Sequence, residues 1–343
     1  MAPERRRSGL VAELRDAVTP RAALLVIGVL ALQLGFIASY LGAFHSPSPR
    51  RIPVAVVAPA GAPAGTAQSV VSRLASLPGH PVAGHVYADQ AAATRAIKDR
   101  KVDGALVLGS ASQDSLLVAS AGGGALSSAL TSVIQQVDAA QQRTLAVTDV
   151  VPAARGDARG LSAFYLAVGW VVGGYLVAAI LGVSAGSRPA NRSRALIRLG
   201  TLAVYSLASG IGGVVISDTI LKALGSGHLI GLCWFGALLV FGVGAFTMAA
   251  QVLLDTVGIG VAILLFVILG NPSAGGAYPK PLLPPFWAAI GPWLPPGAGT
   301  SAVRGIVYFG GAGVALPALV MAAYALVGVV VTVACARPRR ILA

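Results

Sequence analysis

Residues 22–44 read AALLVIGVLALQLGFIASYLGAF, a run that contains no charged side chain. About 20 apolar residues in a helix cross the ~30 Å hydrocarbon core of a bilayer. Five further runs follow later in the chain, at residues 161–185, 199–221, 229–250, 252–270 and 312–336. The sequence therefore predicts an α-helical multi-pass membrane protein with six transmembrane helices.

Composition and charge agree with this prediction. Of the 343 residues, 56% are hydrophobic and 11% are charged, whereas soluble domains carry about 25% charged residues. The net charge of +13 is typical of nucleic-acid-binding proteins, but the arginines flank the hydrophobic runs. Because cytoplasmic loops carry an excess of Lys and Arg, we expect the lipid bilayer and not nucleic acid as the partner. The chain is expected in the cell membrane with both termini cytoplasmic, the C-terminal tail being residues 337–343.

Residues 1–21 precede the first run and are expected on the cytoplasmic side. Leu10 and Leu14 share one face of a predicted amphipathic helix over residues 9–18, and a solvated tail is the alternative. The run at 22–44 is longer than the 7–15 apolar residues of a signal peptide. We therefore expect an uncleaved membrane anchor.

The mixed stretch at residues 45–160 predicts a small extracytoplasmic α/β domain between helices 1 and 2. Its apolar patterns indicate four strands, at 52–58, 85–87, 102–108 and 115–120, and three helices, at 64–77, 89–101 and 125–142. Strands that alternate with helices favour a partly parallel sheet.

The five-helix region at residues 161–336 contains one irregular segment, 271–311, which is rich in proline and aromatic residues. It is too broken to cross the membrane but too apolar for a free loop. We expect two short re-entrant or interfacial helices on the outer side, where protein covers the irregular backbone. The residues that indicate them are Pro284, Pro285, Trp287, Pro292, Trp293 and Pro295. All four tryptophans of the chain, Trp170, Trp234, Trp287 and Trp293, are expected near the outer interface.

Motifs for chemistry are missing from the sequence. There is no GxxxxGK[ST] phosphate-binding loop and no GxSxG nucleophile motif, so we expect no catalytic residue, no cofactor and no metal. Asp218 and Lys222 are spaced i, i+4 and are expected to pair near the outer end of a span, or to lie in interfacial water. Asp255 is expected at the inner interface, where it would N-cap the fifth span.

Three stretches resemble the type-2 ABC exporter permeases, in particular the YhgE/Pip-like branch. They are IPVAVV at 52–57, AAATRAIKDRKVDGALVL at 91–108, and SAGGAYPKPLLPPFWAAIGPWLP at 273–295 followed by Ala302-Val303-Arg304. The resemblance implies the membrane subunit of an exporter that works as a homo- or heterodimer with a separate ATP-binding subunit. ATP hydrolysis would then occur on that separate subunit, and this chain would not be an enzyme.

The same resemblance assigns positions to the ATPase contact. Helix 9–18 corresponds to a connector helix, and the inner segment 186–198 docks the ATPase through Arg188, Arg192, Arg194 and Arg198. The alternative is a non-transporting scaffold or receptor, associated with phage infection or secretion, whose outer domain binds a partner. With the exporter we expect an amphipathic substrate, although nothing in the spans distinguishes a drug from a lipid or a peptide.

Overall fold

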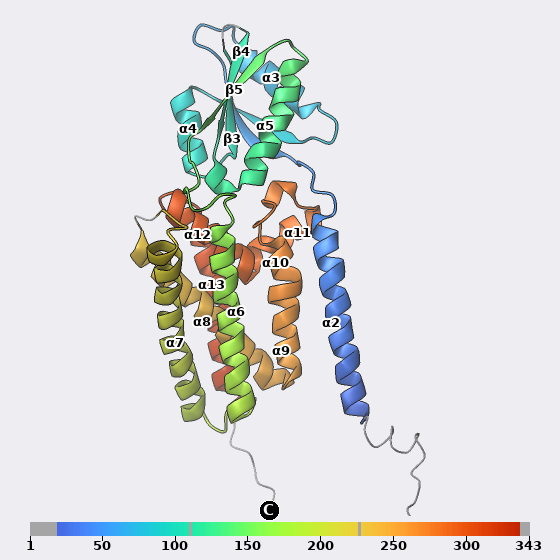
Figure 1. The fold of residues 1–343 in the computed structure, drawn as a ribbon, viewed down its shortest axis with the longest axis vertical. Helices are drawn as coiled ribbons and strands as arrows, with labels where there is room; N and C mark the ends of the chain where they lie inside the picture. The colour runs from blue at the N-terminus through green and yellow to red at the C-terminus, as the bar shows by residue number, and fades with distance from the viewer. Residues whose placement is uncertain (1–18, 110–111, 226–227, 337–343) are drawn as a thin grey trace, which may run out of the picture.

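The computed structural model describes residues 19–109, 112–225 and 228–336 (Figure 1). A domain built around one sheet, called the sheet domain, stands above a bundle of helices, and helix α2 lies to one side of that bundle (Figure 1). The predicted amphipathic helix with Leu10 and Leu14 and the C-terminal tail both fall outside the described residues.

Helix α2, Pro20–Phe44, contains the apolar run 22–44. The hydroxyl of Thr19 accepts a hydrogen bond from the Ala22 amide at 3.2 Å, and Pro20 occupies the first turn, where its missing N–H is not needed. One face of α2 packs against Ile268 through Gly35 and the Ser39 hydroxyl, which bonds the Ile268 carbonyl. Most of its other apolar side chains are exposed, as expected of a helix surrounded by lipid.

The sheet domain holds five strands in the order β2-β1-β3-β4-β5. Strands β1 and β2, β1 and β3, and β4 and β5 run parallel, and β3 and β4 run antiparallel. This mixed sheet confirms a small α/β domain after the first apolar helix. The strands are β1 Ile52–Val57, β2 Val82–Tyr87, β3 Gly104–Val107, β4 Gln113–Val118 and β5 Thr144–Asp149.

Strand β5 was not predicted from the sequence. It lies at the sheet edge and none of its residues is fully buried, so its sequence TLAVTD lacks the apolar run that marked the other strands. The sheet domain therefore continues to Asp149, beyond the predicted helix at 125–142, and residues 150–161 form the linker to the membrane region.

Helices cover both faces of the sheet. Helices α3, Thr66–Ala75, and α5, Gly124–Ala139, pack on the face formed by Ile52, Val54 and Val56. Helix α4, Gln90–Lys98, packs on the opposite face, formed by Ala55, Val57 and Ala105, because successive side chains of a strand point to opposite sides. Both cores continue into the membrane region: Leu282 completes the first and Phe309 the second.

The carboxylate of Asp138 on α5 is buried, and its Oδ2 atom has no hydrogen-bond partner among the described residues. Burial raises the pKa of Asp138 to about 6, the nearby Asp114 adds to the rise, and Arg143 opposes it. The unfolded value is about 3.9, so the folded chain binds more protons between these values. Stability should therefore rise as the pH falls from 7 through 6 toward 4.

We expect Asp138→Asn to raise the melting temperature of the detergent-solubilised full chain at pH 7.5 and to flatten its pH dependence. Burial also raises the pKa of Asp103 to about 6. The stability of this variant should therefore still depend on pH, but less steeply than that of the wild type. Asp99→Asn, on an exposed turn, is the matched control and should leave the slope unchanged. A wild-type slope in Asp138→Asn would show that Asp138 does not titrate in this range.

Within the described ranges, five helices are long and apolar enough to cross a membrane. They are α2, α6 Ser162–Ala185, α7 Arg192–Val214 with its continuation η2 Val215–Ile220, α8 Leu229–Leu254 and α13 Ala315–Ala334. The predicted span at 252–270 corresponds to a shorter apolar helix, Val257–Ser273, formed by α9 Val257–Ala262, η3 Ile263–Leu269 and α10 Gly270–Ser273. The protein is thus membrane-embedded, with five helices of spanning length.

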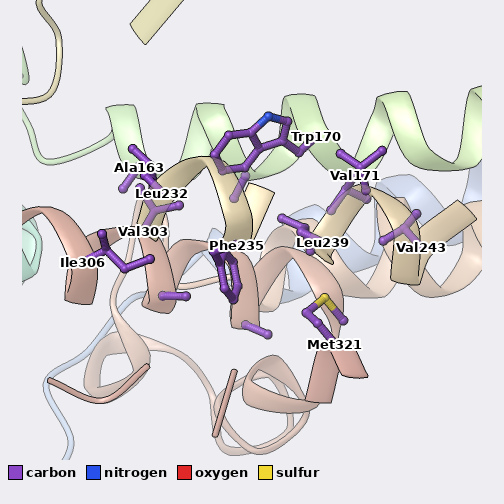
Figure 2. Close-up of a cluster of buried hydrophobic side chains, with 14 of the residues drawn as sticks. Ala163, Trp170, Val171, Leu232, Phe235, Leu239, Val243, Val303, Ile306 and Met321 are labelled. Carbon is purple, nitrogen blue, oxygen red and sulfur yellow. The ribbon is translucent and has the colours of Figure 1, made fainter. Parts of the chain in front are cut away.

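The bundle core forms where α6, α8, α12 and α13 meet, and Figure 2 shows Trp170, Leu239, Phe235 and Met321 among the buried side chains that fill it. Trp170 is 2% exposed, and its indole nitrogen donates to the Ser209 carbonyl at 3.0 Å. Trp287 is also buried, whereas Trp234 and Trp293 are exposed. Trp170 is therefore part of the protein core and does not face lipid, and the depth of the four tryptophans in the bilayer stays a prediction.

The segment 271–311 contains more helix than predicted. After η4, Lys280–Leu282, the short α11, Pro285–Ile290, and η5, Gly291–Trp293, lead into α12, Pro295–Tyr308. Helix α12 is almost wholly buried, and Ala302, Val303 and Ile306 join the bundle core. The prolines at its start misled the prediction of two short helices, because proline is tolerated in the first turn.

Candidate functional site

A cavity of about 860 Å³ lies between the sheet domain and the helices beneath it, and we call it the junction cavity. Its volume falls within the ~300–1,000 Å³ of typical ligand sites. The sheet domain contributes Arg50, Arg51, Ile97, Arg100, Asp103 and Leu126 to its wall. The membrane region contributes Lys280, Leu283, Arg304, Phe309 and Leu316.

Arg304 holds the floor of the junction cavity together. It is 4% exposed on α12, and its Nη1 atom donates to the Gly275 carbonyl at 2.8 Å. Its Nη2 atom donates to the carbonyls of Gly160 at 2.9 Å and Gly276 at 3.3 Å. Gly160 and Gly275 have positive φ angles of 67° and 71°, a backbone conformation that glycine adopts without strain. One guanidinium thus joins α12, the linker before α6 and the turn after α10.

Arg100 attaches the sheet domain to α12. It follows α4, and its Nη1 atom donates to the Ser301 carbonyl at 2.9 Å while Nη2 donates to the Ser301 hydroxyl at 3.2 Å. Its guanidinium also lies over the Phe309 ring, 5.3 Å from the centroid, within range of a cation–π interaction. Burial lowers the pKa of Arg100, and Asp103 opposes that shift.

A second contact joins the linker to the end of α12. The Tyr308 hydroxyl donates to Oδ2 of Asp157 at 2.9 Å, and Oδ1 of the same buried carboxylate accepts from the Ser162 amide at 2.8 Å. Asp157 therefore fixes the first turn of α6 against α12. Through Gly160 and Asp157, the start of α6 is tied to the floor of the junction cavity.

The positive charge of the cavity wall is not neutralised within the described part of the chain. Arg50, Arg51, Arg100, Lys280 and Arg304 line it, and Asp103 is the one carboxylate among its lining residues. The two ion pairs of the described residues, Lys101–Asp99 and Arg143–Asp114, lie elsewhere. A concave surface lined by charge of one sign attracts ligands of the opposite sign.

The proline and tryptophan residues that indicated the outer helices lie in different places in the structure. Pro285 and Pro292 line the junction cavity. Trp287 packs against Gly42 and Ala43 of α2 instead, and Trp293 is exposed. Pro284 immediately precedes α11 and Pro295 begins α12.

The predicted ion pair between Asp218 and Lys222 does not form among the described residues. Asp218 lies in the π-helical turn η2, and Lys222 follows its end with a φ of 51°. The backbone therefore leaves the helical path before Lys222, and the i, i+4 geometry is lost. Lys222 is exposed at the end of the bundle next to the sheet domain, where its carbonyl lies close to Gly156 of the linker.

Asp255 lies at the opposite end of the bundle, called the far end. The prediction that its side chain N-caps the following helix is wrong. Asp255 ends α8 with a φ of 55°, and its carboxylate accepts a hydrogen bond from the Ser187 hydroxyl. The residue before α9 is Thr256, whose side chain makes no capping bond.

The basic segment 186–198 at the far end is not one loop. Helix α7 begins at Arg192, and Oδ1 of Asn191 caps it by accepting from the Arg194 amide at 2.9 Å. Arg188 donates to the Val252 carbonyl at 3.0 Å, and Arg198 donates to the Gly186 carbonyl at 2.7 Å. These two arginines satisfy the open carbonyls at the ends of α8 and α6.

Arg192 and Arg194 remain available at the far end. Both are exposed in the first turn of α7, and neither side chain bonds a described residue. The structure therefore divides the four predicted docking residues into two that hold helix ends and two that face outward.

Sequence reasoning missed Arg50, Arg100, Lys280 and Arg304 as site residues. Arg304 carried the clearest signal, since it is the one charged residue in the stretch 295–308, and an isolated charge inside an apolar stretch usually has a specific partner. The other cations come from distant segments that only the fold brings together.

Comparisons of this chain with protein-family models, curated proteins and solved structures found no significant match.

Proposed function

We propose that this chain is the membrane subunit of an ABC-type exporter in the cell membrane, acting as a dimer with a separate ATP-binding subunit. The observation that carries this proposal is the junction cavity, which is lined jointly by the sheet domain and the helices of the membrane region. A ligand bound there touches both parts. Any movement of the helices relative to the sheet domain would therefore change its binding.

The proposed orientation places the sheet domain outside and the far end in the cytoplasm. Arg188, Arg192, Arg194 and Arg198 all belong to the α6–α7 turn and the start of α7 at the far end, which supports this orientation by the positive-inside rule. The helix Val257–Ser273 is about 25 Å long at 1.5 Å per residue. It comes close to the ~30 Å of the hydrocarbon core, and we propose it as the sixth crossing.

Helix α6 supplies a mechanical link for the proposed transport cycle. It runs from the cavity floor, where Asp157 and Gly160 hold its start, to the far end, where Arg198 donates to the Gly186 carbonyl just past its last turn. An ATPase that closes against Arg192 and Arg194 would push on the α6–α7 turn. Because a helix transmits such a displacement along its axis, the push would alter the cavity at its other end.

The resembling segments support the same function. Residues 91–108 supply Arg100 and Asp103 to the cavity wall, and residues 273–295 supply Lys280 and Leu283. The stretches on which the exporter resemblance rests thus meet at one site, although they lie far apart in the sequence.

The double variant Arg192→Glu with Arg194→Glu is expected to abolish co-purification of an ATPase from native membranes. Like charges across a docking surface cost several kcal/mol. The helix itself should tolerate the change, because acidic side chains are favourable at a helix N-terminus. The measurement is ATPase activity and mass spectrometry of the affinity-purified complex.

Arg192→Lys with Arg194→Lys keeps the charge and is the matched control, which should retain the ATPase. Orientation is checked by labelling Ser112→Cys, in a background without Cys233 and Cys335, with an impermeant thiol reagent from outside. Should the unmodified protein capture no ATPase, the exporter proposal fails. The alternative of a scaffold or receptor whose outer domain binds a partner then replaces it.

A further inference from the structure

The wall of the junction cavity is both strongly cationic and largely apolar. Five cationic side chains and one carboxylate line it. Much of the remaining wall is apolar and includes Ile97, Leu126, Leu283, Phe309 and Leu316. Ligand sites are usually apolar with a few placed polar groups that orient the ligand. A wall with a large excess of positive charge selects a ligand that carries negative charge and apolar surface.

The cations differ in their availability. Both terminal nitrogens of Arg304 and of Arg100 already donate to protein oxygens, so these two residues contribute mainly a positive field. The backbones at Arg50 and Lys280 lie close together, because the Arg50 amide donates to the carbonyl of Pro281, the residue after Lys280, at 2.9 Å. Arg50 is half-buried and Lys280 is exposed, and neither side chain bonds a described residue. Arg51 also lines the cavity and its side chain bonds no described residue, so Arg50, Arg51 and Lys280 are the cations available to a ligand.

We propose that the junction cavity binds an anionic amphiphile whose phosphate or carboxylate headgroup contacts Arg50 and Lys280 and whose apolar chain lies against the apolar wall. This assignment deepens the proposed function by naming the substrate class, and as a statement about substrate it rests on that function. Charge-assisted hydrogen bonds from Arg and Lys to such a headgroup are about twice as strong as neutral ones.

The electrostatics of the neighbouring arginine support the proposal. Burial lowers the pKa of Arg100, which means that the charged form of its side chain is less stable there than in water. A bound anion would stabilise the charged form. The Arg100 side chain also touches α12 through Ser301, so charge compensation at the cavity would strengthen the contact between the two parts of the molecule.

The test uses the purified full chain in nanodiscs of zwitterionic lipid, without any ATPase. Three probes are titrated: dodecyl phosphate, dodecylphosphocholine, which adds a compensating cation to the same chain, and inorganic phosphate. We expect saturable binding of dodecyl phosphate alone. The variant Arg50→Gln with Lys280→Gln should weaken it at least tenfold, and Arg95→Gln with Lys98→Gln, which removes two exposed cations of α4 outside the cavity, should not.

Each other outcome overturns the proposal. Equal binding of inorganic phosphate would make the site one for a free anion, and equal binding of dodecylphosphocholine would show that net charge is not selected. Wild-type affinity in the Arg50→Gln, Lys280→Gln variant would place binding elsewhere. The single variant Lys280→Gln, at an exposed side chain, keeps the test valid if the double variant does not fold, and it should still weaken binding measurably.

The two proposals can fail separately. Binding of dodecyl phosphate without any captured ATPase would leave the cavity assignment standing and remove the exporter. An ATPase captured by a chain that does not bind dodecyl phosphate would remove only the anionic amphiphile.

Discussion

Arg304→Met is expected to destabilise this protein strongly, because it removes the guanidinium that joins α12 to two other segments. The substitution keeps a long side chain in the space but removes every donor, so the carbonyls of Gly160, Gly275 and Gly276 lose the bonds that Arg304 gives them. An unsatisfied buried polar group costs about 1–3 kcal/mol. Gly160 and Gly276 are buried and Gly275 is half-buried, so we expect a loss of at least about 2 kcal/mol.

The measurement is the yield and melting temperature of the detergent-solubilised full chain. Arg95→Met, at an exposed position on α4, is the matched control and should change stability by no more than about 0.5 kcal/mol. Arg304→Lys should give an intermediate result, since an ammonium cannot reproduce the planar set of donors of a guanidinium. A melting temperature of Arg304→Met near that of the wild type would contradict the role assigned to this residue.

Five of the six predicted spans are helices of spanning length in the described part of the chain, because length and hydropathy, which the sequence shows directly, are what a membrane-crossing helix requires. Helix ends were predicted less well. Helix α7 begins at Arg192 and not at residue 199, because a helix continues into the polar interface as long as its backbone is capped. Asn191 supplies that cap, and a hydropathy pattern does not register it.

The segment 271–311 shows a second limit of sequence reasoning. Proline and glycine normally interrupt helices, yet Pro295 and Pro296 occupy the first turn of α12. Gly299 lies where α12 approaches Ala167 of α6, since a Cβ atom there would come within 2.9 Å of the alanine methyl. The residues that indicated a broken segment are thus the ones that let a helix begin and pack closely.

The residues that line the junction cavity could not be predicted from the sequence, for a different reason. Its cations come from residues 50–51, from the end of α4, from the turn at residue 280 and from α12, and no local pattern connects these places. What the sequence does provide is the isolated Arg304. Its partners are glycine carbonyls, which carry no side-chain signal at all.

Glycine permits close packing of helices in a membrane, and the structure shows that neighbouring glycines differ in this role. On α7, a Cβ atom at Gly210 would lie 2.5 Å from the Cys233 carbonyl oxygen and 2.8 Å from the Ala237 amide nitrogen of α8. At Gly212, two residues along the same helix, a Cβ atom would meet nothing within 4 Å.

The second large effect follows from this difference. Gly210→Ala must push α7 away from the backbone of α8, which no rotamer change can avoid, and such overpacking costs about 1–3 kcal/mol. Gly212→Ala adds the same methyl group to open space and should leave the melting temperature of the full chain unchanged or slightly raised. Equal effects of the two substitutions would show that α7 and α8 do not touch at Gly210. A lower melting temperature for Gly210→Ala alone would establish that contact. Helix α7 carries Arg192 and Arg194 in its first turn. Gly210→Ala would then be a variant that displaces the proposed docking surface without changing its charge.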